Sequence, residues 1–230
     1  MDSVGEIVYP RHIMKDPIKQ YWNTRIKKCQ KALAANNFEV FVVPSAARAR
    51  DVALKKIIPA TGAGSVSWGG SQTFKDSGLY DALKDSPSLK ALDTYDKTIS
   101  RDEVLERRRQ ALLVDLFISG TNAVTETGIL VNLDMIGNRA GAITFGPKHV
   151  LILAGRNKIV PDVGSAMERI KDYAAPVNAR RLAKKTPCAR TSLCRDCDVP
   201  DRICNTWVIT EKSFPKDRIK VVLINEDMGF

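Results

Sequence analysis

A glutamate, two basic residues and a group of cysteines are the residues of this chain whose types and spacing could do chemistry. Glu126 is the only acid in a polar loop that precedes the apolar run 129–131. A carboxylate in such a loop can act as an acid, a base or a nucleophile once its surroundings shift its pKa. The plainer interpretation is that Glu126 caps a turn or pairs with Arg139 or Arg156. Both interpretations stay open on the sequence alone.

Arg156 and Lys158 follow the apolar run 149–154, which has the pattern of a strand. The carboxyl ends of parallel strands open on ligand crevices. Arginine binds a carboxylate through two parallel hydrogen bonds, and lysine adds a mobile point charge. The pair therefore predicts a clamp for a small anion, and an ordinary solvated loop is the alternative. Three polar residues of the same loops are further candidates for ligand contacts: Asn122, Thr125 and Asn157.

A glycine-rich turn, Gly69-Gly70-Ser71, separates a short apolar run from a helical pattern. Such a turn between a strand and a helix can direct backbone N–H groups at an anion. It can equally be a tight turn that needs glycine for its backbone angles. We therefore treat Gly69, Gly70 and Ser71 as candidates for anion binding.

Four of the five cysteines gather near the C-terminal end at the spacing C-x5-C-x2-C-x6-C: Cys188, Cys194, Cys197 and Cys204. Thiolates are ligands for zinc and for iron–sulfur clusters. The common zinc patterns use two C-x2-C pairs, whereas only Cys194 and Cys197 form such a pair here. Three interpretations stay open: a zinc or iron–sulfur site, free structural thiols, or a redox-active pair.

Length and composition favour one folded domain. The chain has 230 residues, of which 44% are hydrophobic, and this is enough for one large core. We expect a single domain over 1–230, with an N-terminal helix at 16–37 and a cysteine-rich segment at 186–206. No apolar run approaches the roughly 20 residues of a membrane-spanning helix. The N-terminus lacks the basic and apolar regions of a signal peptide, so we expect a cytoplasmic protein.

The net charge of +10 raises the question of nucleic-acid binding. Basic residues are interspersed with acids, as in 101–103 and 216–218, and no aromatic residues alternate with them as they do on single-strand-binding surfaces. The pattern argues against nucleic acid and favours a small charged ligand. The triplet Arg107-Arg108-Arg109 has the character of a solvated helix face.

Apolar periodicity predicts alternating helices and strands in the first half of the chain. Three- and four-residue steps over 16–37 place Cys29 on the core face of a helix, and Pro59 is expected to end another helix. A capping box from Ser100 to Glu103 opens a third. The expected helices are 16–37, 45–58, 72–83 with a break at 76–78, and 100–113, and the expected strands are 38–43 and 64–68.

Closely spaced strands are expected in the second half. The spacing between them leaves no room for helices, so part of the sheet should be antiparallel. Proline at 161 and at 176 should open two helices, and a buried strand closes the chain. The expected strands are 116–119, 129–133, 142–145, 149–154 and 219–224, and the expected helices are 161–173 and 176–185.

Two long motifs, NAVTETG at 122–128 and GRNKIVP at 155–161, resemble the lactate-utilisation (LUD) domain family. The cysteine segment and the glycine turn at 69–71 also look like segments of this family. The resemblance covers nearly the whole chain, from the N-terminal helix to 226–230. It implies an α/β fold like that of ribose-5-phosphate isomerase and the CoA transferases, with a mainly parallel sheet flanked by helices and a smaller β-rich insertion.

The resemblance also implies a role in the oxidation of L-lactate to pyruvate, alongside iron–sulfur partner proteins. The C-x2-C-x2-C-x3-C-P run of the cluster-bearing partner is absent, so the chain looks like a small, stand-alone member. In the similar CoA-transferase fold a glutamate at a comparable junction is the nucleophile, which makes Glu126 the catalytic candidate. The alternatives are an acyl- or phosphosugar-handling enzyme and a non-catalytic assembly or electron-transfer partner. A homodimer also stays open.

Overall fold

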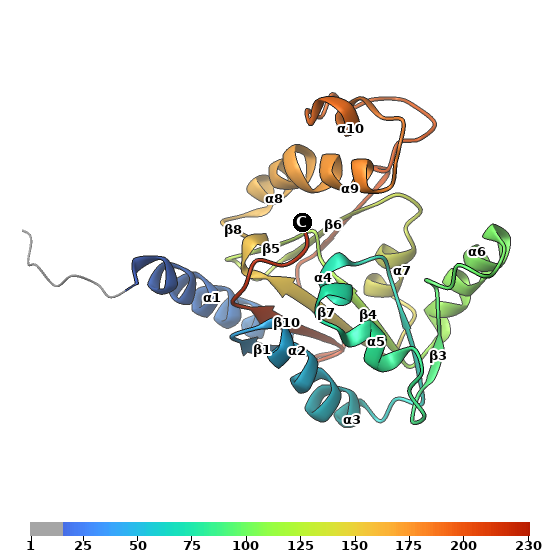
Figure 1. The fold of residues 1–230 in the computed structure, drawn as a ribbon. Coiled ribbons are helices and arrows are strands. Elements are labelled where there is room, and N and C mark those ends of the chain that lie inside the picture. The colour runs from blue at the N-terminus through green and yellow to red at the C-terminus, as the bar shows by residue number, and fades with distance from the viewer. Residues whose placement is uncertain (1–15) are drawn as a thin grey trace, which may run out of the picture.

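A fully parallel sheet of six strands forms the centre of the computed structural model, which describes residues 16–230 (Figure 1). Neighbouring strands run parallel in every pair of this sheet. The order across the sheet is β1 (Glu39–Val43), β10 (Ile219–Ile224), β7 (His149–Gly155), β4 (Leu116–Gly120), β2 (Ser65–Trp68) and β3 (Lys90–Leu92). The predicted α/β fold with a mainly parallel sheet is confirmed.

The central strands are apolar along their whole length because both faces of the sheet are covered. Every residue of β10 is buried. Successive side chains of a strand point to opposite faces, so Leu151 and Leu153 of β7 join one core, whereas Val150 and Ile152 join the other.

Helices cover both faces of the sheet and complete these two cores. One face packs against α2 (Ala46–Val52), α3 (Ile58–Thr61), α4 (Gln72–Asp76) and α5 (Leu79–Leu83). The other packs against α1 (Pro17–Ala35) and α7 (Asn138–Thr144). Cys29 of α1 is fully buried there, as its helical position predicts. The capped helix α6 (Arg101–Gln110) begins as expected, with the Ser100 hydroxyl accepting from the Glu103 N–H.

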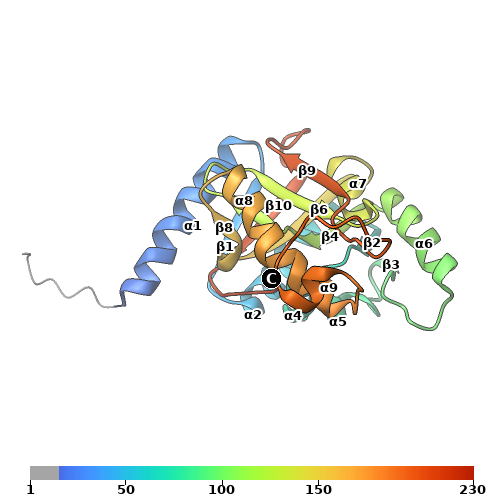
Figure 2. The same cartoon turned by 90° about the horizontal axis from the view of Figure 1, so that it is seen from above.

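A smaller mixed sheet is formed by four strands from the second half of the chain. Its order is β8 (Ile159–Val160), β5 (Ala123–Thr125), β6 (Leu130–Asp134) and β9 (Thr206–Thr210). Strand β6 is antiparallel to β5 and to β9, which confirms the expected antiparallel pairing. The apolar face of this sheet packs against α8 (Val163–Arg169). Figures 1 and 2 show α8 and α9 (Ala175–Arg181) beside this sheet, and Figure 1 shows α10 (Pro187–Thr191) next to α9, with the C-terminal end of the chain between α9 and α4.

The segment 142–145 was predicted to be a strand, and this prediction is wrong. Residues 138–144 form α7, a helix that fits between β6 and β7 despite the short spacing. Gly137 precedes it with a φ of 77°, and the Asp134 carboxylate accepts from the Ala140 N–H. This local capping outweighs the strand-like composition of the segment. Four short strands, β3, β5, β8 and β9, were not predicted, and each has only two to five residues.

Two prolines lie inside longer helical stretches, each after a π-helical segment. Pro59 does not end its helix, since the segment Ala53–Ile57 leads into α3 with the proline in its first turn. Pro176 opens α9 in the same way after Ile170–Ala174. Proline lacks an N–H, and the first turn of a helix is where that loss costs least. Pro161 instead precedes the cap of α8, where the Asp162 carboxylate accepts from the Ser165 N–H.

Within residues 16–230, none of the helices combines the length and the apolar character that crossing a membrane requires.

Candidate functional site

The candidate site is a cavity of about 420 Å³, which we call the anion cavity. The segments that follow the carboxyl ends of β2, β4 and β7 all contribute to its wall. These three strands are neighbours in the main sheet, so their ends bring the loops together, as expected for a parallel sheet. Residues of α7 and α9 line the remaining sides.

Positive charge dominates the wall of the anion cavity. Among residues 16–230, the basic residues of this wall are Lys75, Arg108, Arg139, Lys158, Arg181 and Lys184, and the only acidic one is Asp134. Asp134 is already paired with Arg139. A cavity with this excess of cations favours an anionic ligand, because the ligand would supply the missing counter-charge.

Lys158 is the most unusual of these residues, because its side chain is buried without an acidic partner. Only 4% of the residue is exposed. Its Nζ donates to the Thr73 hydroxyl at 2.8 Å and to the Thr121 carbonyl at 3.1 Å. No carboxylate within residues 16–230 forms an ion pair with it. Burial, and then repulsion by Arg169 and Arg139, lower the pKa of Lys158 to about 7.

Arg139 is held in place by the polar groups at the ends of β4 and β6. Besides its ion pair with Asp134, it donates to the Asn122 side-chain oxygen at 2.9 Å. The same oxygen accepts from the Leu133 N–H at 3.0 Å. Gly69 makes room for this arginine, because a Cβ at Gly69 would lie 2.5 Å from the Arg139 Cγ.

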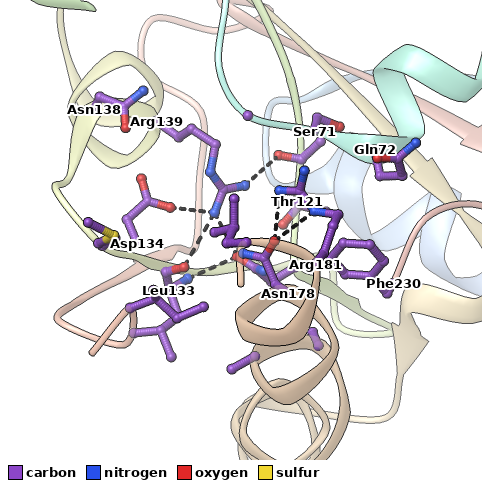
Figure 3. Close-up of a pocket in the computed structure, with 18 of the residues that line it drawn as sticks. Ser71, Gln72, Thr121, Leu133, Asp134, Asn138, Arg139, Asn178, Arg181 and Phe230 are labelled. Atoms are coloured by element: carbon purple, nitrogen blue, oxygen red, sulfur yellow. Dashed lines mark hydrogen bonds and ion pairs between the residues drawn. The ribbon is translucent and has the colours of Figure 1, made fainter. Parts of the chain in front are cut away.

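Arg181 reaches the cavity from α9, across from Arg139 (Figure 3). Its guanidinium donates twice to the Asn178 side-chain oxygen, at 3.1 and 2.8 Å, and lies over the Phe230 ring. Lys75 lies over the Tyr95 ring, 4.3 Å from its centre. Neither cation pairs with an acid in the described part of the chain, so neither is neutralised by a neighbouring carboxylate.

Four of the predicted anion-binding residues line this cavity: Gly70, Ser71, Asn122 and Lys158. Ser71 also caps α4, since its hydroxyl accepts from the Phe74 N–H at 3.1 Å. Sequence reasoning missed Arg181 and Lys75 and named Arg139 only as a partner for Glu126. It treated Arg108 as part of a solvated face, whereas this side chain lines the cavity.

The other predicted residues lie outside the wall. Arg156 pairs with Asp227 at 2.8 Å. Asn157 accepts from the Met228 N–H at 3.0 Å and so fastens the C-terminal segment beside the cavity. Thr125 is buried and shares a hydrogen bond with Thr127.

Glu126 does not line the cavity either. Its carboxylate pairs with Arg25 at 2.5 Å and with Lys28 at 2.8 Å, both on α1. Hydrogen bonds from Lys28 and then from Arg25 lower the pKa of Glu126, although burial opposes them. The pairing interpretation therefore describes this glutamate, with partners on α1 in place of Arg139 or Arg156. These ion pairs hold α1 against the end of β5, and a catalytic role of Glu126 stays a prediction.

All four C-terminal cysteines line one small cavity of about 20 Å³, which we call the cysteine cavity. Three residues, Ala175, Ile203 and Cys204, line both cavities, so the two are neighbours. The cysteines form no disulfide. Among residues 16–230, no three His, Cys, Asp or Glu side chains are grouped so that they could hold a metal ion.

Comparisons with known proteins give a structural neighbour and a family for this chain. A solved structure of a DUF162 family protein from Deinococcus radiodurans is 15% identical, and the alignment covers 88% of this chain and 98% of that one with a TM-score of 0.47. A comparison with curated proteins found no match. The family model for the LUD domain matches residues 26–224. The chain therefore belongs to the LUD domain family, which is associated with lactate utilisation.

Proposed function

We propose that the chain takes part in the oxidation of L-lactate to pyruvate and that the anion cavity binds the carboxylate of one of these acids. The observation that carries the proposal is Lys158, a buried amine without an acidic partner in a wall of five further cations. Membership of a family associated with lactate utilisation supports the choice of ligand. Arg181, Lys75 and Arg108 are the cations proposed to receive the carboxylate, because no acid within residues 16–230 pairs with any of them.

The oxidation removes two electrons and two protons from lactate, so it needs an electron acceptor. Iron–sulfur partner proteins are the proposed acceptors. The cysteine cavity lies beside the anion cavity and shares Cys204 with it, which supports a role in contact with such a partner. The proposal does not require Glu126 as a catalytic group.

A zinc ion or an iron–sulfur cluster at the four cysteines stays a prediction. The thiolates suit either group chemically, but their described arrangement does not gather three of them around one ion. We therefore assign no step of the reaction to a metal. Metal analysis of anaerobically purified protein tests the prediction, which a mere trace of zinc and iron would contradict.

A second candidate function is the handling of an acyl compound or a phosphosugar. The cavity volume of about 420 Å³ favours it, since this lies within the range of sites for ligands much larger than a three-carbon acid. The spread of cations around the wall would also suit a ligand with two anionic groups.

Growth on L-lactate tests the proposed function. A deletion strain of the source organism should regain growth with the wild-type gene and fail with Lys158→Met, which removes the buried amine and keeps an unbranched side chain. Lys55→Met is the matched control, because Lys55 is 77% exposed on a π-helical segment outside the cavity. Growth on glucose checks that each strain is healthy. Full growth on L-lactate with Lys158→Met would contradict the proposal.

A further inference from the structure

We propose that Lys158 forms an imine with the carbonyl carbon of a 2-oxo acid bound in the anion cavity. This inference deepens the proposed function and rests on it, because it takes the cavity as the site of a small organic acid. Pyruvate is the simplest ligand of this class.

The surroundings of Lys158 suit a nucleophile better than a structural ion pair. Its Nζ contacts a hydroxyl and a backbone carbonyl, Thr73 and Thr121, and no acid engages it in the described part of the chain. Lys158 is one of the residues that line the cavity, so a bound ligand lies next to it. A structural lysine buried this deeply would need a carboxylate to offset its charge.

The charges around Lys158 favour the neutral amine that the reaction needs. Arg139 of α7 and Arg169 of α8 repel its proton, while Asp76 of α4 attracts it more weakly. With burial, these groups bring the pKa to about 7. About half of the molecules then hold a neutral amine at pH 7, whereas an ordinary lysine is almost wholly protonated.

The two ends of a 2-oxo acid match the two kinds of group in the cavity. The carboxylate would be received by cations that have no acidic partner, such as Arg181 and Lys75. This placement would leave the neighbouring carbonyl carbon free to meet the Lys158 amine. L-lactate has a hydroxyl in place of the keto group, so it cannot form the imine and would bind through its carboxylate alone.

The proposed step is balanced without any oxidant. The nitrogen lone pair forms a bond to the carbonyl carbon, and the carbonyl oxygen takes up the two protons of the amine and leaves as water. A carbon–nitrogen double bond remains. The Thr73 hydroxyl, 2.8 Å from Nζ, is positioned to pass a proton between nitrogen and oxygen.

Reductive trapping tests the imine. The full-length protein is incubated with pyruvate and sodium cyanoborohydride, and the modified peptide is identified by mass spectrometry. We expect one adduct per chain, on Lys158, in the wild type and in Lys55→Met, and none at this position in Lys158→Met. The rate of trapping should reach half its maximum near pH 7, the pKa of this amine, whereas surface lysines require a far more alkaline pH.

Parallel calorimetry with pyruvate separates the two possible failures. If pyruvate binds and no adduct forms on Lys158, the imine is wrong while the proposed function stands. Labelling spread evenly over surface lysines would also overturn the imine. If pyruvate and L-lactate both fail to bind, the proposed function falls together with the inference.

Discussion

Replacing Lys158 by methionine is expected to make the unliganded protein more resistant to unfolding, by about 1 to 4 kcal/mol at pH 7. The substitution removes a charge that is buried without an acidic partner and leaves an apolar chain of similar length. A site that binds anions tightly often lowers stability in this way, because its charge is meant for the ligand. Urea denaturation monitored by circular dichroism measures the change.

The increase in the free energy of unfolding that Lys158→Met brings should depend on pH. The folded protein holds Lys158 with a pKa of about 7, and the ordinary value is 10.5. Between these two values the unfolded chain binds the extra proton, so the stability of the wild type rises with pH. The advantage of Lys158→Met should therefore be complete below pH 7 and shrink toward pH 10. A loss of stability in Lys158→Met, or a gain equal to that of Lys55→Met, would contradict the account of this residue.

Replacing Gly128 by alanine is expected to destabilise the protein by about 3 kcal/mol or more. Gly128 has a φ of 83°, which L-residues rarely adopt, and it lies against the backbone of α1. An added Cβ would fall 2.4 Å from the carbonyl carbon of Ala32 and 2.6 Å from the nitrogen of Leu33. The contacting atoms belong to the backbone of α1, which cannot move independently of the helix. The whole helix would therefore have to shift away from Gly128, and this shift would expose the buried side chain of Leu33.

Gly62→Ala separates the clash from the backbone strain. Gly62 has a φ of 63°, and a Cβ there would meet no atom within 4 Å. Gly62→Ala should therefore lower the free energy of unfolding by only about 1 to 2 kcal/mol. Urea denaturation of both variants makes the comparison. Equal losses would show that α1 is not held closely at Gly128.

The sequence predicted the main sheet well because buried parallel strands are nearly continuous apolar runs. It also placed Ser71, Asn122 and Lys158 at strand ends, and the parallel order of β2, β4 and β7 brings those ends to one cavity. The positions of these three residues follow from the order of the parallel strands, and the alternation of helices and strands in the sequence indicates a parallel sheet.

The rest of the site depends on contacts between distant segments. The loop sequence around Glu126 does not show that Arg25 and Lys28, about one hundred residues earlier, will occupy its carboxylate. Arg181 reaches the cavity only because α8 continues through a π-helical segment into α9. Arg156 and Lys158 are two residues apart, but the 3₁₀ turn between β7 and β8 buries the lysine and leaves the arginine to pair with Asp227.

Calorimetric titration of pyruvate and L-lactate at pH 7 tests most directly whether the anion cavity is a site for small organic acids. The wild type and Lys55→Met should bind at least one of the two acids with one equivalent per chain. Lys158→Met should bind pyruvate at least about tenfold more weakly, because it lacks the amine that meets the keto group of this acid, and the loss of such a contact costs about 1.5 kcal/mol or more. Equal affinity of Lys158→Met and the wild type, or no binding of either acid to the wild type, would contradict the assignment of this cavity.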